Sequence, residues 1–129
     1  MNEIEIKSLV EKANKSIETA EIALKRGDFD SSVSRTYYAM FYVVEALLLS
    51  KNIKTKTHKG LISSFSLHFI KKGLFSQDMG RKLNKALDKR LMGDYEFVSV
   101  NEKETEDLLK MGKDFIHQII QFLINAKNL

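Results

Sequence analysis

Apolar residues recur at three- and four-residue steps along most of the chain, the spacing that places side chains on one face of an α-helix. The first stripe predicts a helix over residues 3–25, followed by Gly27 where a left-handed C-cap is common. The next helix, from an N-cap at Asp28 or Asp30 to about Lys51, is apolar on most sides. Such a helix belongs in the middle of a bundle.

Three further helices are predicted downstream, each opened by a residue that favours an N-cap. A polar loop over residues 52–56 precedes the first of them, and a linker over residues 93–100 precedes the last. The predicted helices are 57–72 capped by Thr57, 76–91 capped by Ser76 or Asp78, and 101–126 capped by Asn101 in a capping-box pattern with Glu104.

Composition agrees with this helical pattern. Proline, which breaks helix interiors, is absent from all 129 residues, and there are only 6 glycines. No repeat or shift in composition marks a second unit, so the sequence predicts a single domain over residues 1–129. Its expected fold class is all-α, an up-and-down bundle of four to five helices.

Several classes of protein are excluded or disfavoured. The absence of cysteine excludes a disulfide framework, a thiolate metal site and a cysteine nucleophile. The longest apolar run, residues 43–49, is interrupted by Glu45 and is far shorter than the ~20 residues that span a bilayer. The N-terminal segment has no basic start followed by an apolar core, as a signal peptide would. We therefore expect a cytoplasmic protein with no membrane partner.

The net charge of +4 conceals a marked asymmetry. Residues 51–90 hold 11 basic and 2 acidic side chains, a balance of +9, whereas the segments before and after are acidic. Such a block suits nucleic acid, a polyphosphate or an acidic partner. It suits equally well a solvated lysine-rich surface, or one that faces the acidic segments of the same chain.

The most unusual local feature lies in the most apolar helix, in the segment Ser-Arg-Thr-Tyr-Tyr-Ala-Met-Phe-Tyr over residues 34–42. Arg35, Tyr38 and Tyr42 share one helix face, and Glu45 continues it. An arginine among so many apolar residues needs a partner, because a lone buried charge is very costly. Either a carboxylate clamps Arg35 in a structural lattice, or Arg35 binds a phosphate at the edge of a cleft, beside tyrosines that hydrogen-bond or stack.

A second group lies where the fourth predicted helix ends, and there Arg90 precedes Asp94 and Tyr95. Asp94 is a natural partner for Arg35, which would tie the linker to the central helix. Alternatively, Arg90 and Asp94 pair locally. Either arrangement would act as a structural latch.

His58, with Lys59 beside it, stands at the start of the third predicted helix, where it would meet an anion together with the helix N-terminus. The alternative is an exposed or capping histidine. Neither His68 nor His117 has a second ligand at metal-binding spacing, and the phosphate-loop and nucleophile-elbow motifs are absent. We therefore expect no metal and no cofactor.

These residues together resemble the HEPN domains, a family of small helical proteins. The resembling elements are Ser34–Tyr42, Glu45–Leu48, Thr57–Gly60 with Phe65, and Arg90 followed by Asp94 and Tyr95. The resemblance implies a four- to five-helix bundle that usually pairs into a homodimer. Many members are ribonuclease toxins of toxin–antitoxin pairs, and their usual partner is a minimal nucleotidyltransferase.

The family's nuclease motif, an arginine followed by four to six residues and then histidine, is absent from this chain. After Arg35 the corresponding position holds Tyr42, and neither Arg26, Arg81 nor Arg90 is followed by histidine at that spacing. Tyrosine is a poorer general base than histidine at neutral pH because its ordinary pKa is about 10.

The first hypothesis is therefore a HEPN-type toxin-like or nucleotide- and RNA-binding protein that acts with a nucleotidyltransferase. Metal-independent ribonuclease activity would use Arg35 to stabilise charge on phosphorus and Tyr42 in place of the missing histidine. The candidate phosphate-binding residues are Arg35, Tyr38, His58, Lys59, Arg90, Asp94 and Tyr95. The alternative is a non-catalytic dimeric module that binds a protein, and a weaker one is a bundle that binds a small ligand.

Overall fold

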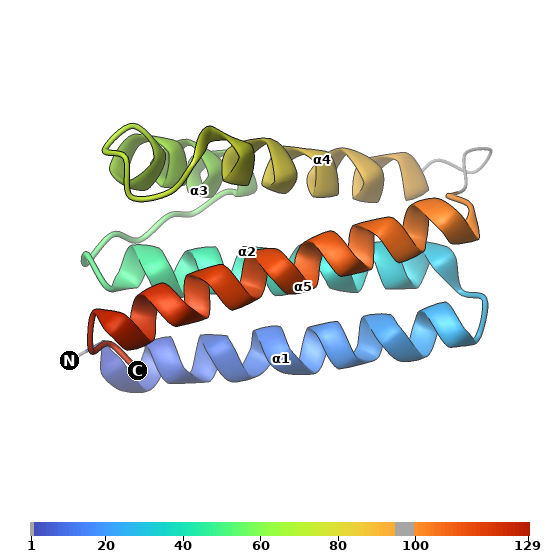
Figure 1. The fold of residues 1–129 in the computed structure, drawn as a ribbon, viewed down its shortest axis with the longest axis horizontal. Helices are drawn as coiled ribbons and strands as arrows, with labels where there is room; N and C mark the ends of the chain where they lie inside the picture. The colour runs from blue at the N-terminus through green and yellow to red at the C-terminus, as the bar shows by residue number, and fades with distance from the viewer. Residues whose placement is uncertain (1, 95–99) are drawn as a thin grey trace.

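The structure is a computed structural model that describes residues 2–94 and 100–129. Its regular elements are helical throughout the described residues (Figure 1). They are α1 (Glu3–Lys25), α2 (Phe29–Leu49), α3 (His58–Phe65), the π-helical turn η1 (Ser66–Ile70), α4 (Gln77–Gly93) and α5 (Glu102–Asn125). The predicted all-α bundle is confirmed.

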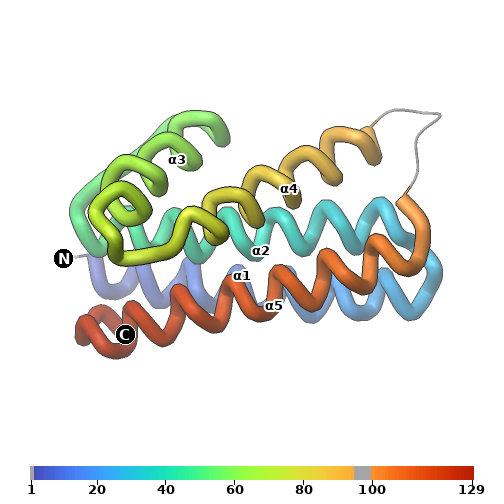
Figure 2. Tube along the Cα trace, turned by 45° about the horizontal axis from the view of Figure 1, so that its top comes forward, coloured from blue at the N-terminus to red at the C-terminus, as the bar shows by residue number. Residues whose placement is uncertain are grey.

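Successive long helices run in opposite directions, so α1, α2, α4 and α5 form an up-and-down arrangement (Figure 1). The short α3 and η1 lie with α4 on one side of α2, while α1 lies on the other side (Figures 1 and 2). Helix α2 contacts α1, α3, α4 and α5. The position predicted for the most apolar helix is therefore confirmed, and α2 is the axis of the bundle.

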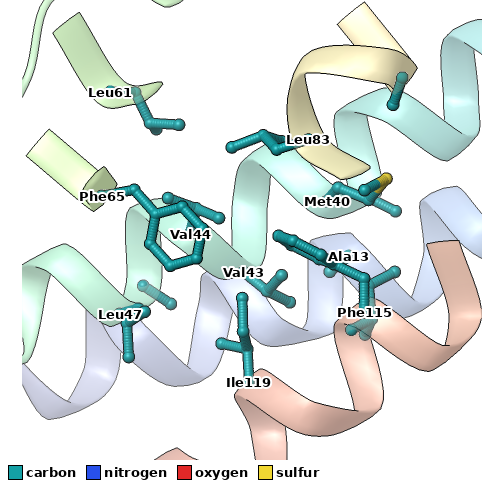
Figure 3. Close-up of a cluster of buried hydrophobic side chains, with 14 of the residues drawn as sticks. Ala13, Met40, Val43, Val44, Leu47, Leu61, Phe65, Leu83, Phe115 and Ile119 are labelled. Atoms are coloured by element: carbon teal, nitrogen blue, oxygen red, sulfur yellow. The ribbon is translucent and has the colours of Figure 1, made fainter. Parts of the chain in front are cut away.

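The core forms where the apolar face of α2 meets the other helices (Figure 3). Val43 and Leu47 of α2 lie beside Phe115 and Ile119 of α5, and Phe65 of α3 reaches the same cluster. These side chains are excluded from solvent, and burial of a large apolar side chain stabilises a fold by about 1.5–3 kcal/mol. None of the described helices has the length and apolar character needed to cross a bilayer.

Side-chain caps fix several helix starts. The Asp28 carboxylate accepts from the amide of Ser31 at 3.3 Å, so Asp28 rather than Asp30 opens α2. Thr57 accepts from the amide of Gly60 at 2.8 Å and thereby opens α3 at His58. Both caps satisfy amides that have no partner within the first turn of a helix.

The last helix opens with the predicted pair. The side-chain oxygen of Asn101 accepts from the amide of Glu104 at 2.8 Å, and the Asn101 amide group donates to the Glu104 carboxylate at 3.3 Å. The return bond therefore reaches the Asn101 side chain, whereas in the usual capping box it reaches the backbone of the N-cap residue.

Several boundaries differ from the sequence prediction. Helix α4 ends at Gly93 rather than near Leu91, and its N-cap residue Ser76 makes no side-chain cap hydrogen bond. Helix α2 ends at Leu49 rather than near Lys51, because Asn52 has a left-handed backbone with φ of 61° and the amide of Ile53 bonds back to the carbonyl of Leu48. The predicted helix 57–72 is broken into α3 and η1, where the amide of Lys71 donates to Ser66 O at 2.8 Å. This wider turn keeps Phe69 buried in the core.

Candidate functional site

Three aromatic side chains of α2 surround the imidazole of His58. The ring of Phe41 lies 4.7 Å from the imidazole, between ring centres, and the rings of Tyr37 and Tyr38 lie 5.6 and 5.8 Å away. His58 reaches them because it is the first residue of α3, whose start is fixed by the Thr57 cap. The structure thus joins two sequence elements that lie about twenty residues apart, and we call Tyr37, Tyr38, Phe41 and His58 the aromatic cluster.

A direct hydrogen bond anchors the imidazole. The hydroxyl oxygen of Tyr37 lies 2.7 Å from Nδ1 of His58, and the two rings are nearly parallel, with 25° between their planes. The Tyr37 side chain is fully buried, while His58 is partly exposed. One nitrogen of the imidazole is therefore held by the interior of the protein, and the other is available for a ligand.

Two guanidinium groups gather on the ring of Tyr38. The central guanidinium carbon of Arg35, one helical turn away on α2, lies 4.9 Å from the centre of this ring. The corresponding atom of Arg90, from α4, lies 5.0 Å from the same centre and 5.8 Å from that of Tyr37. Both are within the range of a cation–π interaction. The predicted shared face of Arg35 and Tyr38 is confirmed, and Arg90 joins it from another helix.

The predicted ion pairs of these arginines are not formed. Among the described residues, neither Arg35 nor Arg90 has a carboxylate within ion-pair distance, so the expected pairing of either one with Asp94 was wrong. The reason is their alternative packing: both guanidinium groups lie over Tyr38, whereas Asp94 is the exposed C-cap of α4. Arg35 and Arg90 are only partly buried, so water can solvate them without a carboxylate.

The backbone beneath this site is tied to α1. The buried hydroxyl of Ser16 donates to the carbonyl of Arg35 at 2.7 Å. This bond comes from α1, and the backbone of α2 is therefore held in place at Arg35.

Tyr42 lies at the other end of the same face. Its ring centre is 6.1 Å from that of Tyr38, and Nζ of Lys12 in α1 lies 5.4 Å from the centre of the Tyr42 ring. Glu45 follows one turn later and is also partly buried. The order Arg35, Tyr38, Tyr42 predicted from helical spacing is thus found on one face of α2. We call the rings of Tyr38 and Tyr42 the aromatic line; Arg35 lies at one end of it and Lys12 at the other.

Burial shifts three ionisable groups near this line. Burial raises the pKa of Tyr37 to about 12, although the charge of Arg90 acts in the opposite direction. Burial lowers the pKa of His58 from its ordinary value, and the positive charge of Arg90 lowers it further. Burial raises the pKa of Glu45, opposed in part by Lys12. At neutral pH the cluster therefore holds a protonated tyrosine and a neutral imidazole.

The remaining predicted site residues are less closely associated. Lys59 is exposed beside His58, and Asp94 is exposed at the end of α4. Tyr95 lies outside the described residues, so its predicted role stays a prediction. Within residues 2–94 and 100–129, no three His, Asp or Glu side chains are grouped in a way that could hold a metal ion.

Tyr37 and Phe41 are the site residues that sequence reasoning missed. Both occupy apolar positions of α2, and no local spacing connects either with His58. The only available signal was the aromatic density of residues 37–42 together with an isolated histidine at a predicted helix start.

Comparison with known proteins places the chain in a family. The model of the HEPN domain matches residues 6–123, which is most of the sequence. The chain belongs to the HEPN family. The resemblance carried by residues 34–42 and 57–60 is therefore confirmed over nearly the whole HEPN chain.

Relatives from archaea and bacteria match over similar lengths. A Methanocaldococcus jannaschii protein named as a putative toxin is 37% identical over 97% of this chain and 85% of its own length. A second protein of that organism, with the same description, is 33% identical over 89% of this chain and 86% of its own. A UPF0332 protein from Thermotoga maritima is 32% identical over 90% of this chain and 89% of its own.

Proposed function

We propose that this HEPN protein binds the phosphate groups of single-stranded RNA or of a nucleotide at the aromatic cluster. Arg35 and Arg90 hold the phosphate, and Tyr38 offers the surface between them. The observation that carries the proposal is the convergence of two arginines from different helices on one tyrosine ring, with no carboxylate paired to either among the described residues.

Electrostatics supports an anionic ligand. Two guanidinium groups near one another repel, and a phosphate between them removes this repulsion and forms charge-assisted hydrogen bonds. Arginine is well suited to the task because its planar group can bond two phosphate oxygens at once and can also stack on an aromatic ring. The +9 balance of residues 51–90, which include Arg90, adds a longer-range attraction.

The neighbouring aromatic rings favour a nucleic acid over a simple phosphate. Tyr38 and Tyr42 are partly exposed on the same face, and partly exposed aromatic rings can stack against unpaired bases. Stacking of this kind is tolerant of base identity. We therefore expect a preference for single strands and little dependence on sequence.

The proposal extends to the biological setting of the protein. Two relatives are named as putative toxins, and we extend that role to this chain as a toxin-like component. In this proposal it forms a homodimer and acts with a minimal nucleotidyltransferase in a toxin–antitoxin-like pair. Co-purification of the chain with the product of a neighbouring nucleotidyltransferase gene tests this part separately.

The contacts support binding of RNA, whereas cleavage also needs a general base. Metal-independent attack by a 2′-hydroxyl requires a base to remove its proton, and Tyr42 replaces the histidine that would serve. Tyr42 lies at the end of the aromatic line, next to Lys12. We therefore assign RNA binding to this site and treat cleavage as a separate measurement.

The test is binding of a labelled single-stranded RNA at several salt concentrations, by fluorescence anisotropy, with purified wild-type protein. Arg35→Gln and Arg90→Gln are each expected to weaken binding several-fold and to reduce the salt dependence by about one phosphate contact. Arg81→Gln is the matched control, because Arg81 lies on α4 like Arg90 but is exposed and pairs with Asp78.

Equal losses for Arg81→Gln and Arg90→Gln would show that binding reflects net charge alone, and the site assignment would fail. Incubation of the same RNA with and without EDTA measures cleavage. Cleavage that persists in EDTA and is lost in Arg35→Gln would support this site and add catalysis to it. No binding by the wild type at low salt would overturn the proposed function.

A further inference from the structure

We infer that Tyr37 is a positioning residue that holds neutral His58 with its proton on Nε2, so that the imidazole donates a hydrogen bond to the bound phosphate. The inference rests on the proposed function for its ligand. The assignment of the proton rests only on the geometry of the Tyr37–His58 contact.

The Tyr37 hydroxyl is a buried hydrogen-bond donor. Its oxygen lies 2.7 Å from Nδ1 of His58, and the side chain is fully buried. Within the described residues this is the only hydrogen bond formed by the hydroxyl. A hydroxyl has one hydrogen to donate, and leaving a buried donor unpaired is costly.

The hydrogen shared by Tyr37 and His58 belongs to one of two atoms, the hydroxyl oxygen or Nδ1. When Tyr37 donates, its hydrogen is satisfied and Nδ1 is the acceptor. When Nδ1 donates instead, the hydroxyl hydrogen has no acceptor among the described residues. The first arrangement satisfies both groups, so Nδ1 carries no hydrogen and the neutral ring carries its proton on Nε2.

The surrounding charges agree with a neutral ring. The hydroxyl of Tyr37 stays protonated at neutral pH because its pKa is about 12. Burial and the nearby Arg90 disfavour a positive charge on His58. The groups that face the imidazole are therefore a neutral phenol, the rings of Tyr38 and Phe41, and one guanidinium.

The other nitrogen of the imidazole is Nε2. No described residue forms a hydrogen bond with Nε2 of His58, and the side chain is partly exposed. In this tautomer Nε2 is a donor, and phosphate oxygens accept hydrogen bonds. His58 would thus add a neutral donor to the cations of Arg35 and Arg90, and Nε2 in this state cannot act as a base toward a 2′-hydroxyl.

The experiment is ¹⁵N NMR of the histidine side chains in the wild-type protein at pH 8. Long-range ¹H–¹⁵N correlations distinguish the two neutral tautomers of each imidazole. We expect His58 to be almost entirely in the Nε2–H form. His117, exposed on α5, serves as the internal control for a freely exchanging histidine. A wild-type His58 in the Nδ1–H form, or in a mixture like that of His117, would overturn the inference.

Tyr37→Phe tests the positioning role, because it removes one oxygen and keeps the ring. The His58 tautomer ratio should move toward that of His117. An unchanged ratio would show that Tyr37 does not position the imidazole. The wild-type spectrum decides the proton assignment even if this variant fails to fold.

Two substitutions of His58 connect the tautomer to the ligand. Glutamine places an amide N–H near the position of Nε2, whereas asparagine places one near Nδ1. We expect His58→Asn to bind single-stranded RNA about five-fold more weakly than the wild type, a loss of the size of one ordinary hydrogen bond. His58→Gln should bind about as tightly as the wild type. Equal losses in both variants would overturn the donor role. Absence of RNA binding by the wild type would overturn the proposed function and leave the NMR assignment to stand on its own.

Discussion

Nδ1 of His58 lies 2.7 Å from the hydroxyl oxygen of Tyr37, and this contact joins the first residue of α3 to the buried centre of α2. The partial burial of His58 at this position, beside Arg90, makes the stability of the fold depend on pH. Burial and Arg90 lower the pKa of folded His58 below its ordinary value of 6.5. In the window between the two pKa values the unfolded chain binds more protons than the folded one, so stability rises with pH there.

We therefore expect His58 to destabilise the fold as the pH falls below about 6.5, with the effect complete below the folded pKa. Urea unfolding of the wild type and of His58→Gln between pH 5 and pH 8 measures it. The difference in unfolding free energy between the two proteins should shift against the wild type on acidification. A difference that is constant across this range would contradict the prediction.

Features that depend on residues close together in the chain could be predicted from the sequence. Thr57 and Asn101 act within three residues of themselves, so their caps could be predicted from spacing alone. The face shared by Arg35 and Tyr38 is a property of one helix and was equally accessible. These local features account for the helix starts and for half of the candidate site.

The remaining half depends on how helices pack against one another. The partner of Tyr37 lies on α3, and the second guanidinium on Tyr38 comes from α4. The expected Arg35–Asp94 pair failed for the same reason: complementary charge suggests a partner, but only packing decides which side chains meet. The π-helical turn η1 likewise keeps Phe69 in the core. The spacing of apolar residues does not distinguish such a turn from a continuous α-helix.

Glu45 carries a second pH effect of opposite sense. Burial raises its pKa above the ordinary value of 4.5, with Lys12 acting against this. For a group whose folded pKa is raised, stability is fully present below the unfolded pKa and is lost as the pH rises through the folded one. Glu45→Gln should therefore be more stable than the wild type at pH 7, with an advantage that disappears near pH 4.

Thermal unfolding of both proteins at the two pH values checks this, with Glu102→Gln as the control. Glu102 is exposed on the first turn of α5 and should show no such gain at pH 7. A Glu45→Gln protein that is less stable than the wild type at pH 7 would show that the attraction to Lys12 outweighs the cost of burial.

Asn101→Ala should lower the unfolding free energy by about 1 kcal/mol, the usual cost of removing an N-cap side chain. The substitution leaves the amide of Glu104 without its 2.8 Å acceptor and removes the return bond from Asn101 to the Glu104 carboxylate. Urea denaturation measures the loss. Asn101→Asp restores an acceptor and should recover most of it, so an equally destabilised Asn101→Asp protein would argue against capping as the cause.

A tight contact between α2 and α5 gives a prediction about packing. Gly112 is buried on α5, and a Cβ atom placed there would lie 2.5 Å from the Cγ2 methyl of Thr36. Thr36 cannot easily turn away, because its side chain is buried and its hydroxyl donates to the carbonyl of Ser32 at 2.9 Å. Gly112→Ala should therefore destabilise the fold by about 1–3 kcal/mol through overpacking, despite the ~1 kcal/mol advantage of alanine in a helix.

The double variant identifies the cause. Thr36→Ser removes the methyl group and keeps the hydroxyl, so Gly112→Ala should cost less in a Thr36→Ser background than in the wild type. Urea denaturation of the four proteins gives the coupling free energy directly. Additive effects would place the clash elsewhere along α5, whereas a favourable coupling shows that the Thr36 methyl and Gly112 set the distance between the two helices.

Because Thr36 lies next to Arg35 and Tyr37, a wider spacing in Gly112→Ala should also weaken RNA binding at the aromatic cluster, and Thr36→Ser should restore it.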